Sequence, residues 1–304
     1  MTAPESTSPP PLALSALDRS GEERLVPGLL DDLRTDAATR VLVIAGDLAP
    51  LSAPDALRWV APSDVPAGAE WGFLGRGPDG TALLAAAFAA QDEELFPAPS
   101  GWGALRAVGG LLSAGDGSAF VEALSLGRWL VDAPYCPACG TRTVLGDAGW
   151  SRRCPSCSRQ HFPRTDPAVI VAITSADDPD ALLLGSNALW AAQRFSCFAG
   201  FVEAGESLEA AVRREVFEES GITVGAVTYH GSQAWPYPRS LMVGFLAEAR
   251  EDSAARADGD EIAAVRWFRR AEIGRALAGE GDIVLPGRAS IAHRLISDWY
   301  AERA

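Results

Sequence analysis

The stretch GFVEAGESLEAAVRREVFEESGI, from Gly200 to Ile222, is the part of the sequence that says most about the fold. It predicts a helix over about 207–220, because Ser207 can cap the first amide groups and Gly221 can take the left-handed conformation that ends a helix. At ~100° per residue, three acidic residues share one face of this helix: Glu215, Glu218 and Glu219.

This acidic face overlaps the side of the helix that is expected to pack inward. Leu208, Ala211 and Val212 lie on the same stripe as Glu215 and Glu219. Burial of unpartnered carboxylates is costly. Mg²⁺ or Mn²⁺ would remove the conflict, because hard divalent cations prefer carboxylate oxygen and share their coordination shell with substrate phosphates. The alternative is a solvated charged helix, which is the usual form of a Glu-rich segment.

The spacing resembles the signature box of the Nudix hydrolases, which cleave a nucleoside diphosphate linked to another group. The matching positions are Gly200, Glu206, Arg214, Glu215, Val216, Glu218, Glu219, Gly221 and Ile222. The resemblance implies that Glu215, Glu218 and Glu219 are the catalytic and metal-ligand carboxylates, and that Arg214 orients a glutamate of the box. Glu218 or Glu219 is the candidate to accept the proton of the attacking water. The sequence alone does not distinguish the general base from the metal ligands among clustered carboxylates.

Four of the five cysteines form two pairs, Cys136-x-x-Cys139 and Cys154-x-x-Cys157, with fourteen residues between the pairs. This spacing is typical of a four-cysteine zinc site, which leaves no open position for water. We therefore expect one structural Zn²⁺ per chain. The alternative is a pair of disulfides, which the absence of a secretory signal disfavours.

Two other residues invite a functional interpretation. His161, four residues after Cys157, can replace a zinc ligand, but we expect it to be a neighbour of the site. Cys197 lies in an apolar segment just before the box, where a buried core thiol is expected instead of a nucleophile.

Length and composition set the limits for the rest of the chain. With 304 residues and 48% apolar residues, the chain is long enough for about two domains with real cores. The net charge of −14 argues against a broad nucleic-acid-binding surface. We find neither a secretory signal nor an apolar run of the ~18 residues that a membrane span requires. We therefore expect a cytoplasmic protein that does not enter a membrane.

We expect a disordered tail over 1–12, an α/β domain over 13–132, a zinc ribbon over 133–165 and a catalytic domain over 166–304. The first domain combines short apolar runs, an Ala-rich stretch at 81–96 and a helix over about 117–131. In the last domain, alternating or continuous apolar runs predict strands and a closing amphipathic helix. The strands are expected at 167–175, 181–187, 194–203, 227–233, 240–250 and 261–268, and the helix at 290–302.

A second motif follows the box, between Ser232 and Met242. Its prolines stiffen a loop that carries aromatic rings, and such rings can stack on a base or only pack locally. Together with the four cysteines, this motif resembles the NADH pyrophosphatase branch of the Nudix family. That branch is usually written SQPWPFP, so Ala234 replaces a proline and Tyr237 replaces a phenylalanine here. The resemblance implies substrate contacts from Gln233, Ala234, Trp235, Pro236, Tyr237, Pro238, Arg239 and Ser240.

The same resemblance implies a fold of the α/β (α+β) class, with a mixed sheet between helices, an intertwined homodimer and two or three catalytic Mg²⁺ or Mn²⁺ ions. It implies hydrolysis of NAD(H) to nicotinamide mononucleotide and AMP, and removal of NAD caps from RNA by at least some members. Further metal ligands are expected from the backbone of Ala199 and the carboxylate of Glu261. Further substrate contacts are expected from Phe162, where the family usually has Tyr, and from Arg106 and Ala292.

Two other functions stay open at this point. A Nudix enzyme can act mainly on another nucleoside diphosphate derivative, such as ADP-ribose or a nucleotide sugar. A zinc-ribbon protein can also be a non-catalytic binding module, although the complete set of box carboxylates in this chain argues against that reading.

Overall fold

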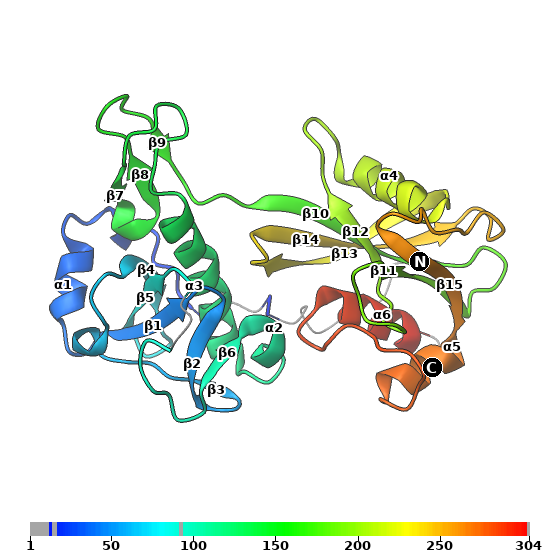
Figure 1. The fold of residues 1–304 in the computed structure, drawn as a ribbon, viewed down its shortest axis with the longest axis horizontal. Helices are drawn as coiled ribbons and strands as arrows, with labels where there is room; N and C mark the ends of the chain where they lie inside the picture. The colour runs from blue at the N-terminus through cyan, green and yellow to red at the C-terminus, as the bar shows by residue number, and fades with distance from the viewer. Residues whose placement is uncertain (1–11, 14–16, 91–93, 303–304) are drawn as a thin grey trace. The chain divides into compact units, whose positions relative to one another are not determined.

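The computed structural model describes residues 12–13, 17–90 and 94–302 (Figure 1). The chain forms two compact units, each described by itself below. The N-terminal unit contains Leu14–Thr165 and the loop Trp235–Arg239, and the C-terminal unit contains Asp166–Ala234 and Ser240–Ala304. The predicted disordered tail, apart from Leu12, lies outside the described residues, and the other predicted domain boundaries stay predictions. Within the described ranges, no helix has the length and apolar character needed to cross a membrane.

The N-terminal unit is built on a six-stranded sheet with the order β3-β2-β1-β5-β4, and β6 pairs with β2 (Figure 1). Strands β1 and β5 run parallel, whereas β1–β2, β2–β3, β2–β6 and β4–β5 are antiparallel. The strands are β1 Arg40–Ala45, β2 Leu48–Ala53, β3 Ala56–Leu57, β4 Glu70–Arg76, β5 Ala82–Phe88 and β6 Trp102–Ala104. The short helices of this unit are η1 Glu23–Leu25, α1 Leu29–Thr35, η2 Pro62–Asp64 and α2 Leu105–Val108.

The Ala-rich stretch of the sequence forms β5, and its small side chains let a long helix approach the sheet closely. Helix α3 (Ala114–Asp132), which confirms the predicted helix, packs on β1, β4 and β5. A Cβ atom on Gly127 of α3 would lie 2.9 Å from the Cβ of Ala87, and one on Gly72 would lie 2.6 Å from a methyl carbon of Leu126. Larger side chains at these positions would push the helix away from the sheet.

The four cysteines lie outside the strands, in the segments next to a small three-stranded sheet that docks on β4 and α3. Its elements are β7 Val144–Gly146, η3 Asp147–Gly149, β8 Ser151–Arg153 and β9 Gln160–His161, in the sheet order β7-β8-β9. The indole N–H of Trp150 donates to the carbonyl of Phe73 at 2.7 Å, and buried Arg152 donates to the carbonyl of Leu130 at 2.6 Å. These bonds to backbone acceptors fasten the cysteine module to the rest of the N-terminal unit.

The C-terminal unit is a mixed sheet with helices on both faces, as the resemblance to the Nudix hydrolases implies (Figure 1). Its strand order is β13-β14-β10-β11-β15, with β12 paired to β10. Strand β10 runs parallel to β14 and antiparallel to β11 and β12. The elements are β10 Asp166–Thr174, β11 Ala181–Asn187, β12 Phe198–Phe201, α4 Leu208–Ser220, β13 Val224–Trp235, β14 Ser240–Ala249, β15 Ile262–Arg269, α5 Arg270–Leu277 and α6 Ile291–Ala301.

Alternation along β10 separates the two layers of the core. Val169 and Val171 join the cluster that contains Val212 and Val216 of α4. The intervening residues point to the other face, where Ile170 packs in the cluster that contains the inner residues of α5 and α6. A strand of period two that is buried on both faces therefore positions α4, with its carboxylates, against one side of the sheet.

A buried carboxylate in α3 of the N-terminal unit makes that unit sensitive to pH. Glu122 is 4% exposed, and its Oε1 lies 3.4 Å from a guanidinium nitrogen of Arg19 and 3.9 Å from one of Arg24. Burial raises the pKa of Glu122 to about 7, although both arginines act in the opposite direction. The native state therefore binds this proton more tightly than the unfolded chain does.

We predict that Glu122 stabilises the fold most at low pH, and that this contribution is lost as pH rises from the unfolded pKa near 4.5 through about 7. The variant Glu122→Gln, which cannot ionise, should lose less stability than the wild type between these limits. Urea unfolding at several pH values measures the difference. If the free energy of unfolding changed with pH in the same way in both proteins, the raised pKa of Glu122 would be contradicted.

Candidate active site

The helix that carries the acidic residues begins and ends where the sequence predicts. The Ser207 hydroxyl accepts the amide N–H of Ala210 at 3.2 Å, and Gly221 adopts φ 70° after the last turn. Of its carboxylates, Glu219 is 6% exposed, Glu215 is largely buried and the side chain of Glu218 is half exposed. The helix is therefore amphipathic with two acidic residues on its inner side, and the solvated-helix alternative is wrong.

Arg214 is the centre of an ion-pair network on this helix. Its guanidinium makes two hydrogen bonds to the carboxylate of Glu206, at 2.9 and 2.8 Å. The same group lies 2.9 Å from Glu215 and 3.0 Å from Glu218, and it donates to the carbonyl of Phe201 at 2.9 Å. One arginine thus joins three glutamates to the end of β12, and the planar guanidinium suits this forked geometry.

Gly200 makes room for the carboxylate of Glu215. A Cβ atom at position 200 would lie 2.0 Å from the carboxyl carbon of Glu215. No side chain can occupy that space, so the glycine is required for close contact and not for an unusual backbone angle. This contact brings the backbone of β12 against the acidic face of α4.

The environment of Glu219 disfavours a negative charge. Burial raises the pKa of Glu219 to about 8, and the charges of Glu261, Glu215 and Asp258 add to the effect. The backbone N–H of Ala199 donates a hydrogen bond to this carboxylate, but its Oε2 is buried and has no hydrogen-bond partner among the described residues. The pKa of Glu215 is also raised, by burial and by the charges of Glu218 and Glu261.

These residues fit a divalent cation. The free carboxylate oxygen, the like-charged neighbours and the nearby backbone provide hard oxygen donors, and the charges that act on Glu219 from the described residues are all negative. Glu261, at the start of β15, is exposed and acts on both Glu215 and Glu219 through its charge. In the described part of the chain, however, no three acidic groups bring ligand atoms within 4.8 Å of one another, as the cysteines do.

The four cysteine thiols lie together, and their spacing fits zinc. Sγ–Sγ distances are 3.7 Å for Cys136–Cys157, 3.4 Å for Cys139–Cys154 and 3.7 Å for Cys139–Cys157. Tetrahedral zinc with Zn–S bonds of ~2.3 Å requires about 3.8 Å between sulfurs. All four are free cysteines, so the disulfide alternative is wrong.

The two neighbouring residues do not take part in either centre. His161 lies in β9, outside the group of four thiols. Cys197 is buried in the core cluster beside α6, and burial raises the pKa of its thiol to about 12. Cys197 is thus a core thiol, because its thiolate form is strongly disfavoured.

Most of the predicted substrate loop lies in the N-terminal unit. The rings of Trp235 and Tyr237 pack at 5.2 Å between centroids, and the Tyr237–Pro238 peptide is cis. Phe162 is 60% exposed and lines a pocket of about 340 Å³ with Arg164, Pro238 and Arg239. The structure thus brings an exposed aromatic ring and part of the loop to one pocket.

Three other residues that were predicted to contact the substrate are buried in the C-terminal unit. Gln233, at the end of the strand predicted over 227–233, is 1% exposed in β13, where it accepts the N–H of Ile291 and donates to the carbonyl of Ala289, both at 2.8 Å. Ala292 is buried in the first turn of α6, and Ser240 is buried at the start of β14. The side chain of Gln233 therefore ties β13 to α6, and its predicted contact with the substrate stays a prediction.

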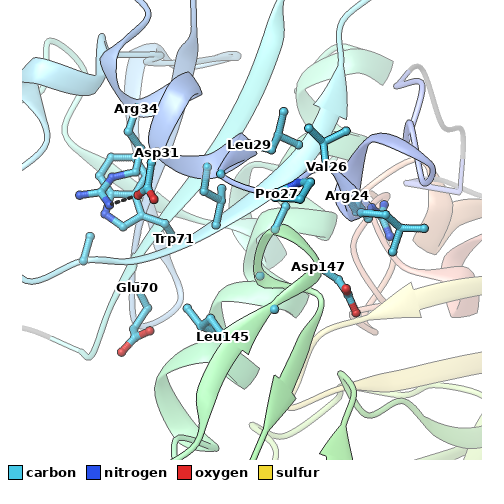
Figure 2. Close-up of a pocket in the computed structure, with 17 residues that line it drawn as sticks. Arg24, Val26, Pro27, Leu29, Asp31, Arg34, Glu70, Trp71, Leu145 and Asp147 are labelled. Atoms are coloured by element: carbon cyan, nitrogen blue, oxygen red, sulfur yellow. Dashed lines mark ion pairs between the residues drawn. The ribbon is translucent and has the colours of Figure 1, made fainter.

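A larger pocket, of about 480 Å³, lies in the N-terminal unit between the η1–α1 segment and the β7–η3 turn (Figure 2). Its lining includes Arg24, Arg34, Trp71 and Asp147, and the guanidinium of Arg34 lies 4.7 Å from the centre of the Trp71 ring. Figure 2 shows charged groups of both signs around this pocket. None of the predicted site residues lines it.

Comparison with known proteins agrees with this arrangement. The NUDIX domain model matches residues 164–285, and the NADH pyrophosphatase zinc ribbon domain model matches residues 132–162. The "NAD-capped RNA hydrolase NudC" of Mycobacterium tuberculosis is 38% identical over 276 residues, which cover 88% of this chain and 85% of the relative. The chain belongs to this family of Nudix hydrolases.

Two eukaryotic relatives of this Nudix hydrolase match over a shorter length. The human "NAD-capped RNA hydrolase NUDT12" is 40% identical over 189 residues, which cover 59% of this chain and 40% of the relative. The "NAD-capped RNA hydrolase" of Schizosaccharomyces pombe is 38% identical over 213 residues, which cover 62% of this chain and 56% of the relative.

Sequence reasoning missed Arg128, which contacts the aromatic loop Trp235–Arg239 of this Nudix hydrolase, and its partner Asp47. Arg128 of α3 donates to the carbonyls of Pro236 and Pro238, and Asp47 pairs with Arg128. No local sequence pattern indicates Arg128 or Asp47, because the residues joined by these contacts are between 81 and 110 positions apart in the chain.

We predict that Gly200→Ala displaces the Glu215 carboxylate and lowers kcat by ~10²-fold, because a shift of about 1 Å in a catalytic group has that effect. The matched control is Gly225→Ala in β13, where a Cβ atom meets its nearest neighbour at 3.8 Å. Circular dichroism should show both variants folded. Wild-type turnover in Gly200→Ala would contradict the tight contact.

We predict that Cys154→Ser removes zinc and lowers thermal stability, because a structural zinc site contributes its binding energy to folding. Metal analysis should give one zinc per wild-type chain and much less in the variant. The exposed neighbour Ser156, changed to Ala, serves as the control and should keep both zinc and melting temperature. An unchanged melting temperature in Cys154→Ser would show that the thiols carry no structural metal.

Proposed function

We propose that this enzyme hydrolyses the pyrophosphate bond of NAD(H) to nicotinamide mononucleotide and AMP, and that it also removes NAD caps from RNA. The observation that carries the proposal is the buried, partly unpartnered carboxylate of Glu219 beside Glu215, on a box helix in a chain with the NADH pyrophosphatase zinc ribbon. The relatives in Mycobacterium tuberculosis and Schizosaccharomyces pombe are named NAD-capped RNA hydrolases, which supports the same substrate class.

The acidic face has a clear chemical use in this reaction. A pyrophosphate is negatively charged and repels an attacking hydroxide. Two or three Mg²⁺ or Mn²⁺ ions, when held by Glu215, Glu219, Glu261 and the backbone of Ala199, would neutralise this charge and activate water. Arg214 holds Glu206, Glu215 and Glu218 in fixed orientations, so that little reorganisation is needed during the reaction.

Two carboxylates are candidates for the proton acceptor. Glu218 extends from the same helix with its side chain half exposed, and Glu219 is buried next to Ala199. Either group can accept a proton from the attacking water.

The aromatic residues of the N-terminal unit would bind the rings of the dinucleotide. Exposed Phe162 and the ring of Trp235 are suited to stacking on a base or on nicotinamide. The guanidinium groups of Arg164 and Arg239 line the same pocket as Phe162 and suit phosphate. The homodimer and the cytoplasmic location expected from the sequence also stay proposals, and light scattering tests the first.

The proposal predicts that the zinc-loaded protein hydrolyses NADH with Mg²⁺ or Mn²⁺, and that Glu219→Gln and Glu215→Gln lower kcat by at least ~10²-fold because each removes a charge but keeps the shape. The control Glu209→Gln changes an exposed acid in the first turn of the same helix and should stay near wild type. Values of kcat/KM on NADH, NAD⁺, a short NAD-capped RNA and ADP-ribose rank the substrates. A clear preference for ADP-ribose would overturn the proposed substrate class.

A further inference from the structure

The loop Trp235–Arg239 has few ways to hold its own conformation. Pro236 and Pro238 have no backbone N–H, so two of the five residues cannot donate a main-chain hydrogen bond. One main-chain hydrogen bond within the loop runs from the N–H of Tyr237 to the carbonyl of Trp235, at 2.7 Å. The carbonyls of both prolines therefore need donors from elsewhere in the N-terminal unit.

Arg128, a partly buried residue of α3, supplies these donors. Its Nη1 lies 2.7 Å from the carbonyl oxygen of Pro236 and 3.3 Å from that of Pro238. The other terminal nitrogen, Nη2, pairs with the carboxylate of Asp47 in the turn between β1 and β2. A planar guanidinium can serve both carbonyls and a carboxylate at once, whereas a lysine ammonium is a point charge.

The ring between the two prolines is held by a second arginine. The amide N–H of Arg106 donates to the hydroxyl oxygen of Tyr237 at 3.1 Å, and the guanidinium of Arg106 lies 4.1 Å from the centre of the ring. Arg128 approaches the same ring at 5.3 Å. The hydroxyl that distinguishes Tyr237 from the phenylalanine of the family pattern therefore has a specific partner.

Asp47 joins the two arginines. Its carboxylate pairs with Arg128, and its Oδ2 lies 3.9 Å from Arg106. Side chains from the β1–β2 turn, α2 and α3 thus converge on one five-residue loop. We refer to Asp47, Arg106 and Arg128 as the loop clamp.

We infer that the loop clamp positions the rings of Trp235 and Tyr237 for the dinucleotide, so that the N-terminal unit sets substrate affinity. This inference rests on the proposed function. Asp47 and Arg128 are positioning residues, because they act through the loop and not on the reacting phosphate. Loss of the clamp releases the loop, and the substrate must then supply the ordering free energy on binding.

The test is steady-state hydrolysis of NADH by the zinc-loaded, full-length protein and its variants. Arg128→Met should raise KM about tenfold or more with kcat within about twofold of the wild type, because the ring platform is lost from ground and transition states alike. Arg128→Lys should rescue only part of the loss. Tyr237→Phe, which keeps the ring and removes one hydrogen bond, should raise KM by about threefold to tenfold.

The matched control is Arg142→Met, because Arg142 is an exposed arginine of the same unit that pairs with Glu70 and not with the loop. It should keep the wild-type KM. Arg128→Met and Tyr237→Phe with lower melting temperatures but wild-type KM would overturn the clamp and leave a structural role alone. A wild type that does not hydrolyse NADH would overturn the proposed function itself, and the clamp with it.

Discussion

The structure of the catalytic unit depends on one electrostatic conflict, the burial of Glu215 and Glu219 on the inner side of α4. Apolar packing of Val212 and Val216 against β10 holds the helix in this position. Gly200 then lets the backbone of β12 come close to the carboxylate of Glu215. The raised pKa of Glu219 reports the cost, which arises from burial first and from neighbouring charges second. A divalent cation would remove that cost, so the same contacts that destabilise the free carboxylates favour the metal-bound form.

In the N-terminal unit, side-chain hydrogen bonds to backbone carbonyls hold both the zinc ribbon and the aromatic loop in place. Arg152 and Trp150 bond to backbone carbonyls of α3 and β4, which fixes the zinc ribbon. Arg128 bonds to carbonyls of the aromatic loop in the same manner. In each case a side-chain donor from one element bonds to a backbone carbonyl of another element. A common physical device thus organises both the metal module and the proposed substrate platform.

Much of this arrangement could be predicted from local sequence patterns. The limits of α4, its N-cap Ser207 and its terminal Gly221 follow from capping preferences, and the two pairs of cysteines follow from zinc-ligand spacing. The Ala-rich stretch carries a weaker signal for a strand, because β5 depends on the close approach of α3 and not on an alternation of apolar and polar residues. The buried position of Gln233 and the contact between Asp47 and Arg128 depend on residues more than fifty positions apart. Such long-range pairs leave no periodic signal in a single sequence.

The most direct test of the central claim is the binding of Mn²⁺ to the zinc-loaded protein, followed by electron paramagnetic resonance of the free ion. If the buried carboxylates of α4 hold the cation, the wild type should bind Mn²⁺, and Glu219→Gln should weaken the affinity by at least about tenfold, because it removes one charged oxygen ligand. Equal Mn²⁺ affinity in the wild type and Glu219→Gln would contradict the account.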